Sequence, residues 1–503
     1  MFRKQEVLML NHSTDFSSLN YYFSEAGKEL YLVGGCVRDL LLGRQPKDYD
    51  LCTNATPEEV IAILKDIEAD WTEGDAISAH IRGEHLPDKR YSIIETGLKH
   101  GTVTIHDHMS NQFYEITTYR VDGKYSDNRH PDEVVFTPSL EEDLKRRDFT
   151  INSFAYDLNT SELVMLNESF LYDLKLGIIR AVGNPFKRFE EDALRMLRAI
   201  RFASQLGFSI DTLTFNAIKV QSWRLSYVSK ERVKDELTKI LLSDNPQMLE
   251  MVCLTGLETY IFGIHDRYPN LGDKDYRRGI TPMTDMLNCE QHNKYHYTDV
   301  FHHTMDVIRR LPKDHDLRWA ALLHDIGKPM DKTVDEEGWE HFYNHAEKSV
   351  GIATYIMEKL KFSNDSTEKI LKFVKYHDYQ LSKVNNKNFK KMLVEIGEDN
   401  FLDFLKLREA DALAHKLSAS TEFAIDSVSK CKERYKRLAL EPQPLRLSDL
   451  AVNGYDMMNL GLKQSTIGKA LNYCLEHVLE HPNDNVKEIL IDLVCEKFLT
   501  DNN

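Results

Sequence analysis

The spacing of apolar residues changes near Pro185, and this change constrains the fold more than any other feature of the sequence. Before it, from Leu30 to about Asp157, short β-rich runs such as 114–119 alternate with a helical stretch. After it, apolar residues recur every three or four positions with few interruptions. A period of two fits a strand, and a period of 3.6 fits a helix. We therefore predict an α+β multidomain protein, with an α/β head followed by a mainly helical remainder.

The length of the chain requires more than one hydrophobic core. At 503 residues, and with roughly 150 residues per domain, about three folded units are expected. Polar stretches at 266–284 and 430–448 have the composition of connecting segments. The predicted parts are an α/β head over 1–160, an all-α neck over 161–265, a histidine-rich domain over 285–415 and a helical tail over 440–503.

Composition and charge exclude several classes of protein. The net charge of −16 argues against a protein that coats nucleic acid non-specifically, because such binding neutralises phosphates with Lys and Arg. A nucleic-acid surface must then be local. The sequence shows neither a bilayer-spanning stretch nor the apolar core of a signal peptide, and its seven cysteines lack CxxC spacing. We expect a cytoplasmic protein with reduced thiols and no membrane partner.

Two glycines and two aspartates form the candidate catalytic motif. Gly34 and Gly35 join an apolar run to a helix, where bare backbone and helix N–H groups can meet phosphate oxygens. Asp48 and Asp50 are two apart, so on a strand both carboxylates point to one side and can hold Mg²⁺. Either pair alone is more often a simple turn, but together they indicate phosphoryl transfer. Glu115 is either a third carboxylate of this site or an exposed strand residue.

Asp192 and Arg195 lie three apart in a helical stretch and are expected to share a face. An aspartate accepts a hydrogen bond from the exocyclic amine of cytosine or adenine, and a guanidinium donates to the neighbouring ring nitrogen. Guanine and uracil present the opposite arrangement and leave buried groups unpaired, at a cost on the order of a few kcal/mol. The pair therefore predicts selection of C and A without a template.

Five segments, in order along the chain, resemble the motifs of one known family. They are LVGGCVRDLLLGRQPKDYDLCT for its first motif, RVDGKYSDNRHPDEVVF for its flexible loop, RRDFTINSFAYD for its second motif, EEDALRMLRAIRF for its nucleotide-reading helix and SKERVKDEL for a neck motif. Together they resemble the class II tRNA nucleotidyltransferase and bacterial poly(A) polymerase family from Tyr31 to about Leu257. The resemblance implies a polymerase beta-like head that uses Mg²⁺, CTP and ATP on a tRNA 3′ end.

Position within these motifs implies roles for further residues. Triphosphate or ribose is expected to contact Gly35, Arg38 and Arg147, the base to contact Asp192 and Arg195, and either of them to contact Arg198 and Arg201. The last two would otherwise be surface charges. One departure concerns Leu166 and Phe170, which occupy places where the family carries an acidic residue and a glycine, although Asp173 and Leu174 are retained. We expect the hinge between head and neck to differ from the family pattern.

Histidine is concentrated in the third predicted domain, where ten of the twenty histidines lie between His265 and His377. A predicted helix ends at the adjacent residues His324 and Asp325, and imidazoles with carboxylates suit divalent metals. His345 and His377, which lie between these residues and Asp411, offer two further imidazole ligands. The set His303, His324, Asp325 and Asp411 resembles an HD domain, which implies a second divalent metal site and, in many members, phosphohydrolysis. Structural packing of the histidines is the alternative.

The sequence thus predicts a tRNA nucleotidyltransferase that adds C, C and A by attack of the tRNA 3′-hydroxyl on the α-phosphate of CTP or ATP. Poly(A), CC-only and A-only addition are alternatives, although the complete loop at 120–136 favours full CCA addition. An HD phosphohydrolase whose head merely binds nucleotide or RNA is a further alternative, against which the paired Asp48 and Asp50 argue. The run 445–471 resembles the tail that follows HD domains in such enzymes and is expected to contact RNA.

Overall fold

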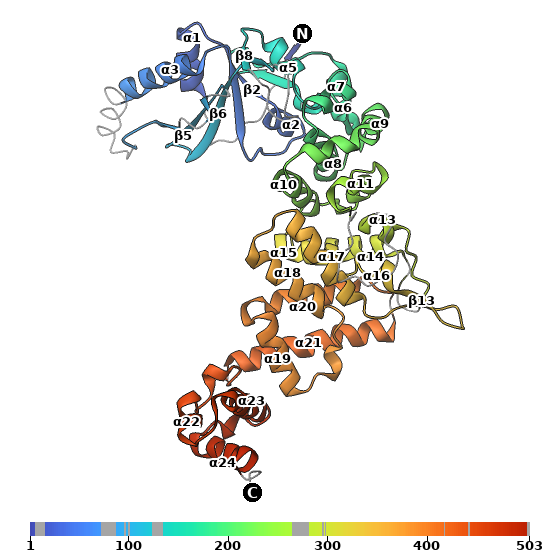
Figure 1. Ribbon diagram of the computed structural model, residues 1–503. Coiled ribbons are helices and arrows are strands. Elements are labelled where there is room, and N and C mark those ends of the chain that lie inside the picture. The colour runs from blue at the N-terminus through green and yellow to red at the C-terminus, as the bar shows by residue number, and fades with distance from the viewer. Residues whose placement is uncertain are drawn as a thin grey trace. The chain divides into compact units, whose positions relative to one another are not determined.

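The computed structural model consists of two compact units. Unit 1 comprises Met1–Ile240 and Met248–Ile261, and unit 2 comprises Leu241–Gln247 and Phe262–Asn503. Figure 1 colours the chain from blue at the start of unit 1 to red at the end of unit 2. The division into four domains stays a prediction. The structure describes residues 1–5, 16–71, 87–94, 97–98, 101–122, 134–263, 281–293, 296, 298–416, 418–440 and 443–499.

Unit 1 is built on a mixed sheet that has eight strands within the described part of the chain. The strand order is β1-β10-β9-β2-β3-β6-β5-β4, in which β3 and β6 are parallel and all other neighbours antiparallel. β2 buries all its residues, whereas β5 alternates because one of its faces is less covered. The strands are β1 (Phe2–Gln5), β2 (Leu30–Val33), β3 (Tyr49–Thr53), β4 (Tyr91–Ile94), β5 (Thr102–Asp107), β6 (Gln112–Thr118), β9 (Phe154–Asp157) and β10 (Glu162–Met165).

Helices pack on this sheet, and the sequence encodes their ends. α3 (Pro57–Asp70) starts after Thr56, whose hydroxyl accepts the N–H of Glu59 while the Glu59 carboxylate accepts the N–H of Thr56. The helix packs on β4, β5 and β6 through its buried apolar residues Val60, Ile63, Leu64 and Ile67, which recur at helical spacing. The other helices beside the sheet are α1 (Ser17–Glu25), α2 (Gly35–Leu41) and α5 (Leu140–Lys145).

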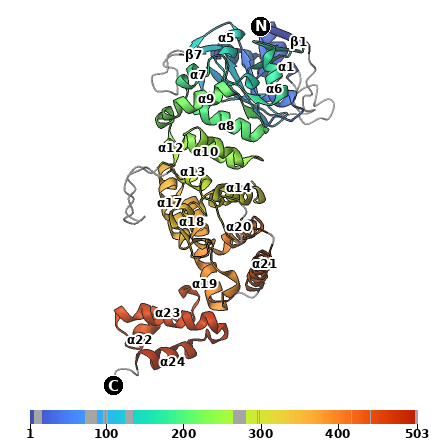
Figure 2. The ribbon, with the colours of Figure 1, turned by 90° about the vertical axis from the view of Figure 1, so that its right-hand side faces the viewer.

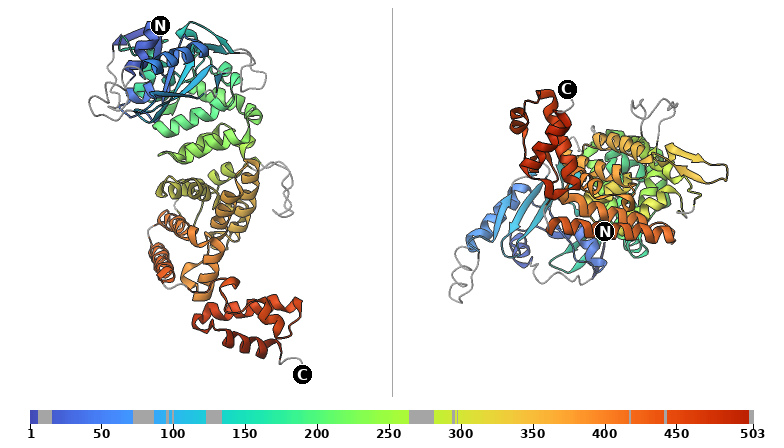
Figure 3. Two further views of the ribbon diagram at one scale, coloured as in Figure 1. Left: turned by 90° about the vertical axis from the view of Figure 1, so that its left-hand side faces the viewer. Right: turned by 90° about the horizontal axis from the view of Figure 1, so that it is seen from below.

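The rest of unit 1 is mainly helical, as the apolar spacing predicts, with a short strand pair of β11 (Ile178–Ile179) and β12 (Ser209–Ile210). Its green helices lie beside one another in Figure 3. The stretch expected to carry both Asp192 and Arg195 is interrupted, because Asp192 adopts φ −140° and ψ 107° and ends α7. The expectation of one continuous helix is therefore wrong at this point. The helices are α6 (Ser169–Leu176), α7 (Pro185–Glu191), α8 (Leu194–Leu206), α9 (Thr212–Gln221), α10 (Lys230–Leu241), α11 (Glu250–Leu254) and α12 (Glu258–Ile261).

The two ends of the predicted flexible loop, 120–136, form short paired strands. β7 (Arg120–Asp122) and β8 (Val134–Phe136) are antiparallel, with Val121 opposite Val135. Residues 123–133, which form the centre of the predicted loop, lie outside the described residues.

Unit 2 is almost entirely helical. The helices from α13 to α21 form one group, which also carries a short hairpin made of β13 and β14. The last three helices, α22, α23 and α24, pack together at the end of the chain (Figure 2) around a small core that includes Met457, Cys474 and Val494. None of the described helices combines the length and apolar character needed to cross a bilayer. The elements are α13 (Pro282–Leu287), α14 (Val300–Arg310), α15 (His315–Leu323), α16 (Lys328–Asp331), β13 (Lys332–Val334), β14 (Glu340–Phe342), α17 (His345–Lys359), α18 (Asn364–Tyr376), α19 (Asn386–Ile396), α20 (Phe401–Leu413), α21 (Ala419–Leu440), α22 (Gly454–Asn459), α23 (Gln464–Glu480) and α24 (Lys487–Phe498).

Candidate active sites

Three carboxylates gather where β3 and β6 pair in unit 1. The parallel register places Asp50 opposite Glu115, and Asp48 directly precedes β3. Desolvation raises the pKa of the Asp50 carboxyl, Glu115 and Asp48 raise it further, and Arg147 opposes them. A divalent cation would relieve the repulsion between these like charges, so this oxygen-rich set fits a metal such as Mg²⁺. Its oxygens are more widely spread than the compact ligand groups of unit 2.

The two glycines form a tight turn beside this acidic group. Gly34 has φ +79°, a conformation that side-chain-bearing residues rarely adopt, and a Cβ there would lie 3.0 Å from Nη1 of Arg147. Gly35 is the first residue of α2, so the unpaired N–H groups of a helix start face the same region. Arg147 is held by Asp143, with 3.1 Å between Nη2 and Oδ2. Backbone N–H groups and a guanidinium therefore lie next to the carboxylates, as a nucleoside triphosphate and its metal require.

Three of the predicted arginines meet at one aromatic ring. The guanidinium carbons of Arg38, Arg198 and Arg201 lie 5.2, 5.5 and 4.2 Å from the centre of the Phe202 ring. Arg38 also donates to Oδ1 of Asn152 at 2.7 Å. The sequence reasoning missed Phe202, although the residue follows Arg201 directly within the quoted motif.

Acidic partners hold these arginines in place. Arg198 donates from Nε and Nη2 to Oδ2 of Asp148 at 2.9 and 2.5 Å, and Nε of Arg201 lies 2.9 Å from Oε2 of Glu236. Burial opposes ionisation of Asp148, but Arg198 and a hydrogen bond from Asn152 lower the pKa of its carboxyl to about 2. Burial also lowers the pKa of Arg201 to about 10. The arginine side chains are therefore oriented in advance, and not free surface charges.

We expect Asp148→Asn to lower the free energy of unfolding by about 2 kcal/mol at pH 7, because it removes the buried carboxylate to which the partly exposed Arg198 donates from two nitrogens. A carboxyl whose pKa is lowered on folding stabilises the fold above its unfolded pKa of roughly 4, and loses that effect as the pH falls toward its folded pKa. The difference between the variant and the wild type should therefore shrink between pH 5 and pH 3. Urea unfolding at these pH values measures it, with the exposed Asp88→Asn as control. An equal difference at both pH values would contradict the ionised pair.

Asp192 and Arg195 each have another partner. Oδ2 of Asp192 lies 3.2 Å from Nη2 of Arg232 on α10, and its Oδ1 accepts the N–H of Leu194. Arg195 donates from Nη1 to Oε2 of Glu191 at 2.6 Å and from Nη2 to the carbonyl of Arg146 at 3.1 Å. The side chains of these two residues are therefore paired with other groups and not with each other. Their polar atoms are satisfied by protein groups that a base would have to replace.

The two positions that depart from the family pattern, Leu166 and Phe170, lie close in sequence to the retained pair Asp173 and Leu174. Leu166 packs against a core cluster that includes Tyr31 and Val33, and Phe170 lies in the first turn of α6. The buried Asp173 accepts a hydrogen bond from Thr150 at 2.9 Å. The retained Asp-Leu pair therefore still ties α6 to the second motif, whatever the substitutions do to a hinge.

In unit 2 the structure brings the four predicted HD residues together. Nε2 of His303 on α14 lies 3.1 Å from Oδ1 of Asp411 on α20, and Nε2 of His324 at the end of α15 lies 3.2 Å from Oδ2 of Asp325. All but Asp411 are fully enclosed by protein. Burial opposes ionisation of Asp325, yet His324 and Lys328 hold its pKa well below the usual range. A buried ionised carboxylate among imidazoles suits a divalent transition metal.

A second ligand group shares Asp325. Its other oxygen, Oδ1, lies 3.3 Å from Nε2 of His345 and 3.4 Å from Nε2 of His377. The sequence offers these two histidines as possible ligands, but they are not part of the set of four that resembles an HD domain. Gly327 makes this approach possible, because a Cβ there would lie 2.6 Å from the carbonyl oxygen of His345. Asp325 therefore stands between two groups of ligands.

The imidazole orientations favour cations at these positions. Nδ1 of His324, His345 and His377 lies 2.6, 2.7 and 2.7 Å from the carbonyl oxygens of Ala321, Phe342 and Val374. A carbonyl accepts only, so each Nδ1 carries the hydrogen, and each Nε2 of the neutral ring offers a lone pair. Nε2 of His345 and Nε2 of His377 nevertheless lie 3.0 Å apart. Facing lone pairs beside a carboxylate repel one another unless a metal or a proton lies between them.

Four of these ligands, Asp325, His345, His377 and Asp411, line a cavity of about 580 Å³. Asp325, Asp411 and His377 line it from one side, and the hairpin of β13 and β14 contributes Trp339 and Tyr343. Metal ligands at the base of a cavity with aromatic walls form a site that a small phosphorylated molecule can enter.

The glycine turn, the acidic strand and the cluster of arginines in unit 1 define a nucleotidyltransferase. Three family models match the chain: Poly A polymerase head domain over residues 30–82 and 74–180, Probable RNA and SrmB-binding site of polymerase A over 207–268, and tRNA nucleotidyltransferase domain 2 (putative) over 331–494. Nucleotidyltransferases of this kind use divalent metals. The metal chemistry inferred at Asp48 and Asp50 agrees with that class.

The relatives narrow the class to one family. The chain is 33% identical over 473 residues to the CCA-adding enzyme of Lactobacillus delbrueckii subsp. bulgaricus, which covers 94% of both chains. It is 43% identical over 279 residues to that of Ligilactobacillus salivarius, covering 55% of this chain and 60% of the relative. The protein belongs to the CCA-adding enzyme family.

The solved structures agree with this assignment. The crystal structure of the Bacillus stearothermophilus CCA-adding enzyme in complex with CTP has a TM-score of 0.66 and 26% identity, and the match covers 97% of this chain and 98% of that one. The predicted fold class, an α/β head followed by a helical remainder, is confirmed.

Proposed function

We propose that this enzyme completes the 3′ end of tRNA in the cytoplasm by adding C, C and A from CTP and ATP. The observation that carries the proposal is the meeting of Asp48, Asp50 and Arg147 at the Gly34 turn, in a chain of the CCA-adding family. The related Bacillus stearothermophilus enzyme, solved with CTP, supports the choice of nucleotide.

The residues of unit 1 divide the work of phosphoryl transfer. Asp48 and Asp50, with Glu115 as a third carboxylate, would hold Mg²⁺, which activates the attacking 3′-hydroxyl and neutralises the departing pyrophosphate. Arg147 and the start of α2 bind and orient the triphosphate next to these carboxylates. Arg38, Arg198 and Arg201 add positive charge from a rigid, acid-paired cluster. The chain supplies position and charge, which are the main requirements of this reaction.

Base selection would follow from an exchange of partners. Asp192 is paired with Arg232 and Arg195 with Glu191, so an incoming base replaces protein groups that already satisfy these side chains. Cytosine and adenine each offer an amine donor, which can replace Arg232 at Asp192, and a ring-nitrogen acceptor, which can replace Glu191 at Arg195. Guanine and uracil lack this arrangement, so their binding does not compensate for the ion pairs that are lost.

We expect Asp192→Ala to lower kcat/KM for CTP and ATP about a hundredfold, and to raise incorporation of UTP and GTP relative to them. The alanine neither accepts from the exocyclic amine nor penalises the wrong base. Single-nucleotide addition to tRNA measures the four rates, with the exposed Asp235→Ala on α10 as the matched control. Equal losses for all four nucleotides would mean that Asp192 only maintains the fold through Arg232.

The direct test uses the purified protein with Mg²⁺ and tRNA that lacks its CCA end. CTP alone should give two added residues, and CTP with ATP should give exactly one further A. A long A ladder would instead identify a poly(A) polymerase, and a stop after CC or a requirement for preformed CC would identify a partial enzyme. No addition with any mixture would overturn the proposal.

A second activity, metal-dependent hydrolysis of a phosphate ester, is favoured for unit 2 by one observation. Two ligand groups share Asp325 at the base of a cavity whose wall includes Trp339 and Tyr343. Divalent metals there would polarise a phosphoryl group, and Asp325 would hold both ligand groups at a fixed separation. The aromatic side chains offer faces on which a nucleobase can stack, so a nucleotide is the substrate class that fits.

A further inference from the structure

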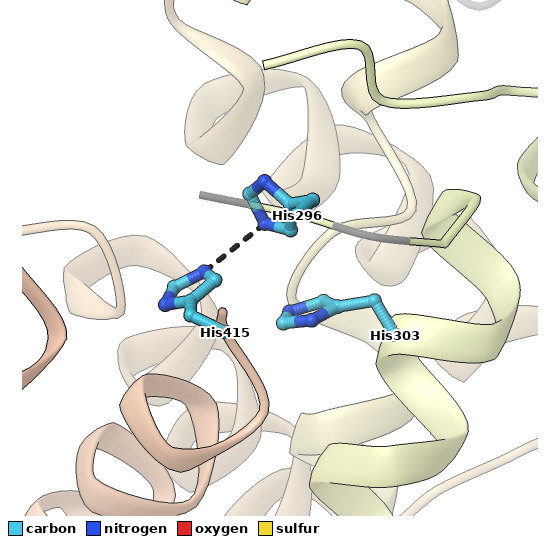
Figure 4. A group of neighbouring side chains, drawn as sticks. All are labelled: His296, His303 and His415. Carbon is cyan, nitrogen blue, oxygen red and sulfur yellow. Dashed lines mark hydrogen bonds between the residues drawn. The ribbon is translucent and has the colours of Figure 1, made fainter. Parts of the chain in front are cut away.

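Two histidines of unit 2 lie outside both ligand groups that contain Asp325. His296 precedes α14, and His415 follows α20; with His303 of α14 they form a cluster of three imidazoles, drawn in Figure 4. One nitrogen of each ring lies within 4.8 Å of the others. Nε2 of His296 and Nε2 of His415 face each other at 3.0 Å. Segments far apart in the sequence therefore deliver three imidazoles to one point.

The orientation of His296 is fixed by a neighbouring amide. Oδ1 of Asn293 accepts the backbone N–H of His296 at 3.0 Å and lies 2.9 Å from its Nδ1. Because that oxygen accepts only, Nδ1 carries the hydrogen and Nε2 of the neutral ring offers its lone pair to the cluster. A polar group that fixes the tautomer of a ring from behind is the usual arrangement around a metal-binding histidine.

His303 supplies an independent observation. Its side chain is 1% exposed, and its Nδ1 has no hydrogen-bond partner among the described residues, while its Nε2 faces Asp411. A buried polar nitrogen without a partner costs about 1–3 kcal/mol. A metal ion bound to this nitrogen would remove the cost.

We propose that His296, His303 and His415 form a third cation position, which shares His303 with one of the two groups that contain Asp325. Three imidazoles select a borderline transition metal such as Zn²⁺ over Mg²⁺ or Ca²⁺, which prefer oxygen. Asp411 connects the positions, because its Oδ1 lies 3.1 Å from Nε2 of His303 and 3.9 Å from Nε2 of His415. His296 and His415 line the same cavity as Asp325.

The position has a chemical consequence for the cavity. Three protein ligands leave a tetrahedral metal one open site, which an anionic oxygen of a bound molecule can take. A cation here adds positive charge to a cavity that Asp335, Glu337 and Asp378 make acidic. A phosphorylated molecule would otherwise be repelled from these carboxylates. Metal binding at the three histidines does not depend on unit 2 being a hydrolase.

The test counts metal in the full-length protein. The chain is stripped with a chelator, dialysed against Zn²⁺ and analysed by mass spectrometry, and Co²⁺ loading reports ligand type by its visible absorption. His296→Gln and His415→Gln should each lose about one metal equivalent relative to wild type and keep full nucleotide addition in unit 1. His345→Gln should remove metal from the group formed by Asp325, His345 and His377, and should leave the Co²⁺ signal of the three histidines. The exposed His481→Gln serves as the control.

Two results would overturn the proposal. In the first, His296→Gln and His415→Gln both hold as much Zn²⁺ as the wild type. In the second, the His345→Gln variant holds no metal at all. A third result would separate the two proposals: the wild type and His345→Gln both hold one equivalent of metal, and His415→Gln holds none. The third position would then stand, and the proposed hydrolase centre would fail. Thermal melting of each variant separates loss of metal from loss of the fold, and His296→Gln repeats the test if His415→Gln does not fold.

Discussion

Asp50→Asn is expected to lower the rate of nucleotide addition at least about a thousandfold while tRNA binding changes little. The amide keeps the shape of the side chain but removes a negative charge from the group formed with Asp48 and Glu115. A weaker cation site loses the neutralisation of the pyrophosphate, which matters mostly in the transition state and therefore lowers kcat more than it raises KM.

The pH dependence gives the same site a second readout. Because desolvation and neighbouring carboxylates raise the pKa of Asp50, protons compete with the cation at a higher pH than at an ordinary aspartate. The wild-type rate should fall as the pH drops through that raised pKa, and extra Mg²⁺ should shift the fall to lower pH. Steady-state rates between pH 5 and pH 8 at two Mg²⁺ concentrations measure this.

The control for Asp50→Asn is Glu58→Gln, an exposed carboxylate in the first turn of α3. It should leave addition and its pH profile unchanged. A wild-type rate for Asp50→Asn, with the protein folded, would remove Asp50 from the reaction and with it the assignment of the acidic strand as the catalytic centre.

Asp325→Asn is expected to remove metal from both groups that share Asp325 and to abolish any phosphate-ester hydrolysis, by at least about a thousandfold. Each carboxylate oxygen faces a different group, and the amide nitrogen of asparagine cannot replace either as a ligand. The variant also leaves Lys328, 2.6 Å from Oδ2, buried beside a neutral group. This should destabilise unit 2 by about 3 kcal/mol.

Metal content, melting of the protein and release of phosphate from a nucleotide test this expectation together. Asp335→Asn is the matched control, because Asp335 lines the same cavity but is paired with His341. Nucleotide addition by unit 1 should survive in both variants at temperatures below melting. Unchanged metal content in Asp325→Asn would show that the shared carboxylate is not a ligand.

Local chemistry explains why much of unit 1 could be predicted. The Gly34-Gly35 turn and the strand with Asp50 each depend on residues within one short segment, so propensity and spacing encode them directly. The same holds for the ordered motifs that indicated the family. For unit 2, the sequence predicted four ligands that the fold brings together: His303, His324, Asp325 and Asp411.

Periodicity failed where a tertiary contact overrides it. Asp192 and Arg195 have helical spacing, but Asp192 leaves the helical conformation and pairs with Arg232 on α10. Phe202 looked like one more apolar residue of a helix, and its ring instead receives three guanidinium groups. Sequence spacing cannot show such partners, because they come from segments that meet after folding.

By itself the sequence determined the α/β head, the helical remainder, the candidate catalytic aspartates and the family, since each is a property of short segments and their order. The tertiary structure alone decided which carboxylate lies opposite Asp50, which acids hold the arginines, and that Asp325 serves two ligand groups with His296 and His415 beside them. Strand register, ring orientation and burial arise from packing between distant segments, and those are the quantities that place charges and lone pairs within reach of one another.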